Sequence, residues 1–219
     1  MNKLFSNNFL YLGILIVTIL VVVTSRFWQL GNLPPGIHID EVSFGYEAQS
    51  LYETGKDTWG QSWPSYFKGF GEFKAPGIIY IYYLLLPFFG HINTIVTRIP
   101  AAISGILTIL IFVMTAKLIA NRLNRWQLLL VGIIFAFSPW HFGLSRVYYE
   151  TSAGFIFIAL GLYYNFSALR KNSFKHWLIS LISFAISGYF YASYRYIVLG
   201  LSLTSYLFIN KFKINIKQY

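Results

Sequence analysis

The side chains most able to do chemistry in this sequence are carboxylates, and they are concentrated in one stretch. Six of the seven acidic residues lie between positions 36 and 77, namely Asp40, Glu41, Glu47, Glu53, Asp57 and Glu72. A carboxylate that aromatic neighbours desolvate near a membrane surface can reach the pKa range of a general base. We therefore predict that the adjacent pair Asp40 and Glu41 is catalytic. The alternative is that this pair only caps the start of a helix.

The seventh acid, Glu150, lies far from the others in the sequence, at the boundary of a predicted membrane span. An ionisable residue at membrane depth is a functional candidate by default. We predict that Glu150 is a third catalytic carboxylate. The alternative is a salt bridge to Arg146, which lies one helical turn earlier.

Four cations complement these carboxylates. They lie at or near predicted span ends, or just before a short apolar helix, and they are Lys74, Arg98, Arg146 and Arg195. Arginine can hold a phosphate with two parallel hydrogen bonds, and lysine supplies a point charge. We predict that these four residues bind a phosphate-bearing substrate. Interfacial snorkelling is the alternative, and it is our interpretation of Arg26.

The composition places the chain in the membrane class. Of its 219 residues, 56% are hydrophobic, 20% are aromatic and only 11% are charged. The net charge of +10 comes from short basic runs between apolar segments, which argues against nucleic-acid binding. The absence of cysteine excludes disulfides and thiolate chemistry. The four histidines show no metal-ligand spacing, so the sequence leaves the metal and any cofactor unknown.

The apolar runs predict the fold. About 17 to 25 apolar residues suffice to cross the hydrocarbon core as a helix. We predict an all-α polytopic membrane protein that forms one module over residues 1–219, with six transmembrane helices at about 9–25, 99–119, 127–142, 151–169, 177–191 and 196–209. We interpret the first run as an uncleaved helix, since it is long for the competing signal peptide.

Between the first two spans the sequence predicts a long outer loop, 26–98, with two juxtamembrane helices. The first covers about 40–53, with Asp40 as N-cap, and 55–60 is predicted to turn. The second covers about 76–89, which is apolar but too short to cross and is bracketed by Pro76 and Pro87. We therefore predict that this second helix lies at the membrane interface.

This topology separates the charges. It places ten basic residues and no acid inside, and seven basic residues with all seven acids outside, as the positive-inside rule expects. The inside set is Lys3, Lys117, Arg122, Arg125, Arg170, Lys171, Lys175, Lys211, Lys213 and Lys217. We therefore expect a multi-pass protein of the cell membrane, with both termini cytoplasmic and the candidate site facing outside.

The order of these landmarks resembles the GT-C type glycosyltransferases that use polyprenyl-phosphate sugars. The nearest groups are the protein O-mannosyltransferases and the bacterial enzymes that add aminoarabinose to lipid A. The resembling segments are Asp40-Glu41, Glu53 to Asp57 with Pro64, Phe73-Lys74-Ala75-Pro76, Thr97-Arg98-Ile99-Pro100-Ala101-Ala102 with Gly105, Ser138-Pro139, Ser145-Arg146 with Glu150, and GYFYASYR from Gly188 to Arg195. The chain departs from the pattern in having Glu150 where many relatives carry Asp, and Ala75 where some carry Pro.

The resemblance implies an inverting transfer of a sugar from a polyprenyl-phosphate donor to an acceptor on the outer face. It implies that the acid of the first outer loop is the catalytic base and that Glu150 lies across the same cavity. The partners would be the lipid-linked sugar, membrane lipid and an acceptor that is a protein, a lipid or a glycan. Family members are typically longer, so we expect this chain to be the amino-terminal part of such an enzyme.

Two other classes of protein remain open at this stage. A transporter or lipid flippase would also line a cavity with charges, although near the bilayer midplane and with internal repeats. A membrane scaffold without catalytic activity would need no acidic cluster. The sugar, the acceptor and the oligomeric state are not determined by the sequence.

Overall fold

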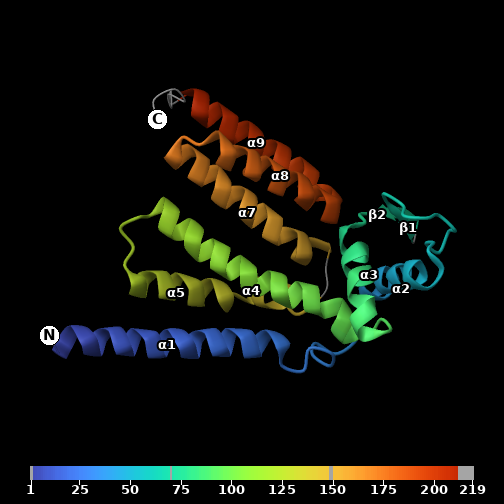
Figure 1. Cartoon of the computed structure of the whole chain (residues 1–219), viewed down its shortest axis with the longest axis horizontal. Helices are drawn as coiled ribbons and strands as arrows, with labels where there is room; N and C mark the ends of the chain where they lie inside the picture. Colours follow the sequence, from blue (N-terminus) through green and yellow to red (C-terminus); the bar gives the residue numbers. More distant parts are fainter. Residues whose placement is uncertain (1, 70, 148–149, 212–219) are drawn as a thin grey trace.

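The chain is mostly helical, with three of its helices suited to crossing a membrane. The computed structural model describes residues 2–69, 71–147 and 150–211, with side chains for 7–69, 71–147 and 150–203. Within these residues the helices α1 (Asn2–Phe27), α4 (Thr94–Ile119) and α7 (Glu150–Lys171) are long and apolar enough to span (Figure 1). They coincide with the spans predicted at 9–25, 99–119 and 151–169. The structure therefore supports a helical membrane protein.

The span predicted at 127–142 is wrong as a single helix. The structure has α5 (Arg125–Ala136), of 12 residues, followed by a short α6 (Pro139–Leu144). Ser138 caps α6 with its hydroxyl, which accepts from the backbone N–H of His141, and Pro139 takes the first position. Proline has no N–H and clashes with the preceding turn, so it ends α5 and opens α6. At 1.5 Å per residue, α5 is too short for the hydrocarbon core.

The last two predicted spans correspond to α8 (Phe174–Phe190) and α9 (Ala192–Lys211). α7 packs between α4 and α8, and Figure 1 shows α9 beyond α8. Small residues permit this contact, since a Cβ added at Gly161 would lie 2.3 Å from the Phe184 ring. The count of six spans remains a prediction, and Lys213 and Lys217, predicted to be cytoplasmic, lie outside the described residues.

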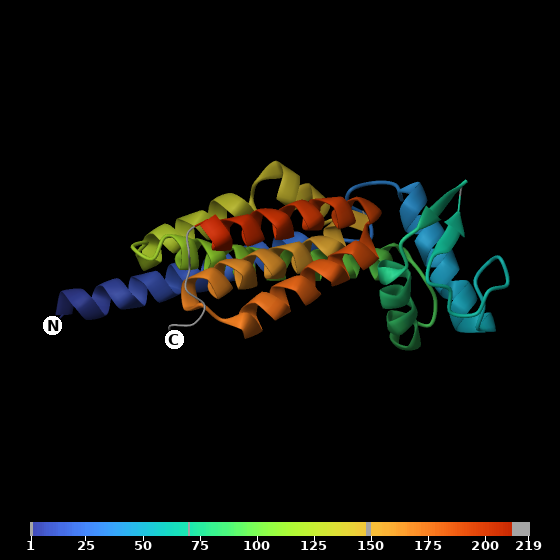
Figure 2. The ribbon, with the colours of Figure 1, turned by 90° about the horizontal axis from the view of Figure 1, so that it is seen from above.

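The outer loop forms a compact unit at one end of the bundle. It contains α2 (Ile39–Thr54), a hairpin of β1 (Phe67–Gly69) and β2 (Glu72–Lys74), and α3 (Gly77–Phe89). Figures 1 and 2 both show α3 crossing the long direction of α4 at the bundle end. The helices match the ones predicted at 40–53 and 76–89, whereas the sequence reading missed the hairpin.

The predicted N-cap of α2 is wrong by two residues. The cap is His38, whose ring accepts from the backbone N–H of Asp40, while the Glu41 carboxylate accepts from the backbone N–H of His38 at 2.9 Å. This exchange is a capping box, which satisfies amides that the helix itself leaves unpaired. Asp40 therefore lies inside the first turn, with a carboxylate that the cap does not need.

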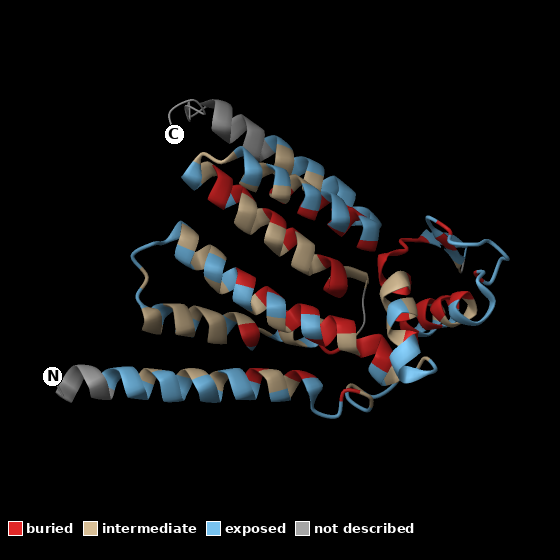
Figure 3. Cartoon of the chain, in the orientation of Figure 1, coloured by how far each residue is buried: buried red, intermediate tan, exposed pale blue. Residues whose placement is uncertain are grey.

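The best-buried apolar cluster joins this outer unit to the bundle. Phe44 and Ala48 of α2 pack on Ile78, Ile79 and other residues of α3, and the cluster extends to α7 and α8. α1 differs sharply, because only 6% of its span is buried inside the protein (Figure 3). Burial from water thus orders the outer unit, whereas α1 is composed to face lipid.

Candidate functional site

The centre of the candidate site is the ammonium group of Lys74, which lies among three carboxylates. Its Nζ donates to Asp40 Oδ1 at 3.0 Å, lies 3.6 Å from Glu150 Oε1, and forms an ion pair with Glu72. These groups come from α2, α7 and β2 respectively. The structure therefore brings together three of the predicted site residues, Asp40, Lys74 and Glu150, from distant parts of the chain.

The hairpin positions Lys74. Antiparallel pairing sets Lys74 opposite Phe67, and Phe67 is 1% exposed in the core beneath α2 and α3. Gly71 at the turn has a φ of +81°, a conformation that glycine adopts without strain. Because Lys74 ends β2 and precedes Ala75 and Pro76, its side chain is fixed at the junction between the hairpin and α3.

The carboxylates keep Lys74 charged. Burial lowers the pKa of the Lys74 ammonium, but its hydrogen bonds to Glu72 and Asp40 and the charge of Glu150 outweigh that effect, so its pKa lies above the ordinary value. The carboxylates outnumber the cation in this cluster by three to one. A carboxylate beside a cation places a proton acceptor and a positive charge in the same site.

A cavity of about 370 Å³ opens beside Lys74. Arg195, from the first turns of α9, lies on the same wall; its side chain is exposed and donates from Nε to the carbonyl of Gly188 at 3.0 Å. The lining residues are Ser65, Tyr66, Phe73, Lys74, Ala75, Pro76, Ala192 and Arg195. Two of the four predicted phosphate ligands, Lys74 and Arg195, thus share one cavity.

Arg98 and Glu41 form a separate, sealed pair. Arg98 Nε donates to Glu41 Oε1 at 3.0 Å, and the two side chains are 1% and 0% exposed. The other four N–H groups of Arg98 donate to the second oxygen of Glu41 and to three backbone carbonyls, those of Leu30, Pro34 and Gly36. All five donors of Arg98 are occupied, so this guanidinium has none left for a phosphate.

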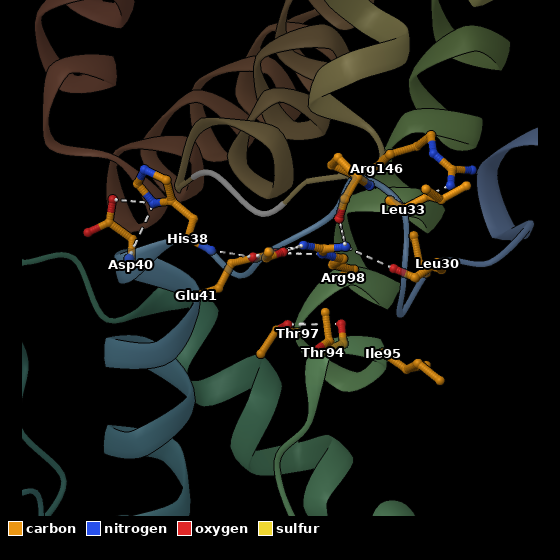
Figure 4. A network of polar contacts seen from close by, with 12 residues as sticks. Leu30, Leu33, His38, Asp40, Glu41, Thr94, Ile95, Thr97, Arg98 and Arg146 are labelled. Carbon is orange, nitrogen blue, oxygen red and sulfur yellow. Dashed lines mark hydrogen bonds and ion pairs between the residues drawn. The ribbon is translucent and has the colours of Figure 1, made fainter.

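Asp40 and Glu41 therefore lie on opposite sides of the start of α2. Figure 4 shows Glu41 directed toward Arg98, and Asp40 beyond His38, away from that pair. Asp40 retains 26% exposure of its side chain, while Glu41 has none. A single step along a helix rotates a side chain by about 100°, which explains the separation.

Arg146 holds the segment that follows α1. Its guanidinium donates to the backbone carbonyls of Ser25, Trp28 and Leu33. The salt bridge between Arg146 and Glu150, which the spacing offered as an alternative, is absent from the described part of the chain, where Glu150 pairs with Lys74. The structure thus separates Arg146 from the carboxylate cluster.

The sequence reading missed the role of Arg26. Its side chain is 0% exposed, so the interpretation of Arg26 as a snorkelling residue is wrong. It donates to the carbonyl of Ala136 and lies 4.4 Å from the centre of the Phe142 ring. The last carbonyls of a helix have no partner within the helix. Ser138 and Pro139 indicate where α5 ends, so they could have identified the Ala136 carbonyl as an acceptor for Arg26.

Two further acids of the outer loop have structural contacts. Glu47 accepts from the backbone N–H and the hydroxyl of Thr58, and Asp57 accepts from the backbone N–H groups of Trp59 and Gln61. The acids of the outer loop therefore divide between the Lys74 cluster, the ion pair with Arg98 and the anchoring of the loop. Within the described residues no group of three or more His, Cys, Asp or Glu side chains is placed to hold a metal ion.

A larger cavity, of about 760 Å³, lies elsewhere, beside the C-terminal end of α1. Its lining is mostly apolar and includes Leu20, Trp28, Phe142 and Arg146, but no carboxylate. The smaller cavity is the better candidate site because Lys74, one of its lining residues, contacts the carboxylates of Asp40 and Glu150.

Comparison with known proteins gives one match. A family model described as dolichyl-phosphate-mannose-protein mannosyltransferase matches residues 73–219, which is more than half of the chain. The matched segment includes Lys74, Arg98, Arg146, Glu150 and Arg195, whereas Asp40 and Glu41 precede it. Searches of curated proteins and of solved structures give no match.

Proposed function

Because this chain belongs to the dolichyl-phosphate-mannose-protein mannosyltransferase family, we propose that it transfers a sugar from a polyprenyl-phosphate donor to an acceptor at the outer face of the membrane. The observation that carries the proposal is the contact of Asp40 and Glu150 with Lys74, which lines a cavity together with Arg195. The reaction needs both a base and a phosphate-binding cation within reach of the same sugar ring.

In the proposed reaction, the oxygen of an acceptor hydroxyl attacks the anomeric carbon of the donor sugar, and Asp40 takes the proton of that hydroxyl. The bond from that carbon to the phosphate oxygen breaks with inversion, and the phosphate oxygen leaves with the electron pair. Lys74 and Arg195 stabilise the charge that develops on the leaving phosphate. Glu150, whose Oε1 lies 3.6 Å from Lys74 Nζ, helps to hold the ammonium in place and can assist as a second carboxylate.

The remaining predicted site residues take structural roles in this proposal. Glu41 and Arg98 hold the 30–36 segment against α4, and Arg146 holds it against the α6–α7 connection. A buried charge that is fully hydrogen-bonded within the protein has little to offer a ligand. Lys74 and Arg195 differ from Arg98 and Arg146 in that they line one cavity together, and we therefore assign phosphate binding to these two.

We also propose that α3 lies along the membrane and helps to hold the lipid carrier. The helix is apolar throughout its 13 residues and presents Leu84 and Phe88, which are 64% and 83% exposed. Exposed apolar side chains of this kind are stable in lipid. Cysteine labelling that places Ile79 or Tyr82 in a true crossing, with Arg98 on the cytoplasmic side, would contradict this arrangement.

Asp40→Asn is the decisive variant for the reaction. Removal of a positioned base lowers the rate by about 10² to 10⁴. The measurement is transfer from a labelled polyprenyl-phosphate sugar, in membranes that contain the natural full-length protein. The matched control is Glu53→Gln, since Glu53 lies on the same helix but contacts Gln49, away from Lys74.

We expect Glu53→Gln to keep its rate and Asp40→Asn to lose it while still binding the donor. Wild-type transfer by Asp40→Asn would sink the assignment of the base. If the wild-type protein binds a polyprenyl phosphate equally with and without its sugar and transfers nothing, the scaffold alternative is correct instead.

A further inference from the structure

A second concavity lies on the outer hairpin, next to the Lys74 cavity but separate from it. Its volume is about 300 Å³. The lining combines three aromatic rings with a carboxylate, an amide and an amine, contributed by Asp57, Trp59, Gln61, Tyr66, Lys68 and Phe73. No part of the proposed reaction uses this concavity, which we call the hairpin pocket.

The aromatic rings of the hairpin pocket are exposed. Trp59, Tyr66 and Phe73 are 60%, 50% and 66% exposed. Exposed apolar groups that gather around a hollow and have polar groups beside them are characteristic of a binding site. Aromatic faces combined with hydrogen-bonding groups match the surface of a pyranose, whose C–H faces stack on rings and whose hydroxyls bond to polar side chains.

The hairpin pocket is also rigid. The Trp59 indole N–H donates to the carbonyl of Lys68 at 2.8 Å, which fixes the plane of the ring. Asp57 Oδ1 accepts from the amides of Trp59 and Gln61 at 3.0 and 2.7 Å, and Glu47 anchors the same turn to α2 through Thr58. A preordered site loses less entropy when a ligand binds.

The position of the hairpin pocket relates it to the Lys74 cavity. Tyr66 and Phe73 line both hollows, with ring centres 5.0 Å apart in an edge-to-face pair. Figures 1 and 2 show the hairpin at the end of the molecule farthest from the start of α1, beyond α3. A ligand in the hairpin pocket would therefore lie next to the cluster and outside the bundle.

We infer that the hairpin pocket binds a pyranose unit of a glycan, as a subsite for an acceptor that already carries sugar. The role as an acceptor subsite rests on the proposed transfer reaction, whereas sugar binding itself does not. An acceptor held there would extend past the Tyr66–Phe73 pair toward Asp40.

The test is saturation-transfer NMR of the purified protein in a detergent without a sugar headgroup, with methyl α-mannoside and methyl α-glucoside as probes. We expect wild-type binding at about millimolar concentration. Trp59→Ala should weaken binding about tenfold or more, since a stacked ring is lost. Gln61→Ala, which keeps the rings, should weaken it less.

Trp63→Ala is the matched control. Trp63 lies in the same loop and is 59% exposed, but it stacks on Tyr80 and does not line the hairpin pocket. Unchanged sugar binding by Trp63→Ala, with loss in Trp59→Ala, supports the inference. Equal loss in both variants overturns it, because the effect would then come from the loop as a whole.

Two further outcomes distinguish this inference from the proposed function. If the wild-type protein transfers sugar but binds neither probe, the hairpin pocket is not a sugar site and the proposed function stands. If it binds the probes but transfers no sugar, the proposed function falls and the hairpin pocket remains a sugar site. Quenching of tryptophan fluorescence by brominated phospholipid vesicles that is weaker in Trp59→Ala, without sugar binding by the wild-type protein, would assign the rings to the membrane surface and overturn the inference.

Discussion

Asp40 and Glu41 are neighbours in the sequence, yet they occupy opposite environments. Glu41 is closed into an ion pair with Arg98, at 0% and 1% exposure. Asp40 shares Lys74 with Glu72 and Glu150, beside an open cavity. The comparison teaches that two adjacent acids can have different environments, one inside the scaffold and the other in a partly exposed cluster.

The physical difference lies in how many partners each cation has within the protein. Arg98 has five donors and five acceptors, so its charge is fully compensated. Lys74 is shared by three carboxylates and also lines a cavity. Saturated networks rigidify a structure, whereas unsaturated ones are available for ligands and protons.

The largest effect that we expect comes from breaking the ion pair of Arg98 and Glu41, and it is a loss of stability of the folded protein. Arg98→Ala would leave Glu41 buried without its cation, and removal of one partner of a buried pair costs about 3 to 5 kcal/mol. Thermal unfolding of the purified protein in detergent measures this loss. Arg122→Ala, at an exposed position in the α4–α5 connection, is the control and should change little.

The double variant Glu41→Leu/Arg98→Met sharpens the same point. Replacement of a buried ion pair by apolar residues of similar size is often neutral. We expect the double variant to recover much of the lost stability, although the carbonyls of the 30–36 segment lose their donor. A double variant with wild-type stability that has lost transfer would contradict the purely structural role of this pair.

Lys74→Met should act on catalysis rather than on the fold. Loss of a preorganised cation at a developing charge lowers the rate by about 10² to 10³. Transfer assays measure the rate, and Lys56→Met, an exposed lysine of the same outer loop, is the control. A Lys74→Met protein that transfers normally would show that the leaving phosphate is bound elsewhere.

The pH profile gives a second test of Lys74. The folded pKa of Lys74 is raised above its ordinary value, so its stabilising charge is fully present below about pH 10.5 and declines only as the pH rises further. Between pH 5 and pH 9 any change in the transfer rate must therefore come from other groups. A basic limb of the profile below pH 9 that disappears in Lys74→Met would contradict this expectation.

The smallest effect that we expect concerns the loop that carries Trp59. Glu47→Gln keeps one acceptor for Thr58 but loses the charged hydrogen bond, at a cost of about 1 to 2 kcal/mol. The change should appear as faster amide hydrogen exchange at 57–61, with transfer by the Lys74 cluster retained. Glu53→Gln is again the control. Equal rates of amide hydrogen exchange at 57–61 in both variants would show that Glu47 does not anchor the loop.

The sequence predicted much of the helical organisation because a helix that crosses a membrane needs a long run of apolar residues, and such runs are easily recognised. The long apolar runs of α1, α4 and α7 and the short proline-bracketed run of α3 were each located within a few residues. The end of α5 before Ser138 and Pro139 was not predicted, because the apolar run continues past these two residues. Apolar composition indicates which segments face lipid, but it does not show where a proline interrupts the backbone hydrogen bonds of a helix.

The sequence by itself determined the residue types of the site, the outer loop that holds most of the acids and the family to which the chain belongs. Only the tertiary structure decided which acid meets which cation. Lys74 reaches Glu150 across 76 residues of chain, and Arg98 reaches Glu41 across 57. Pairings over such separations depend on how α2, the hairpin and α7 pack, and local sequence carries no signal for that packing.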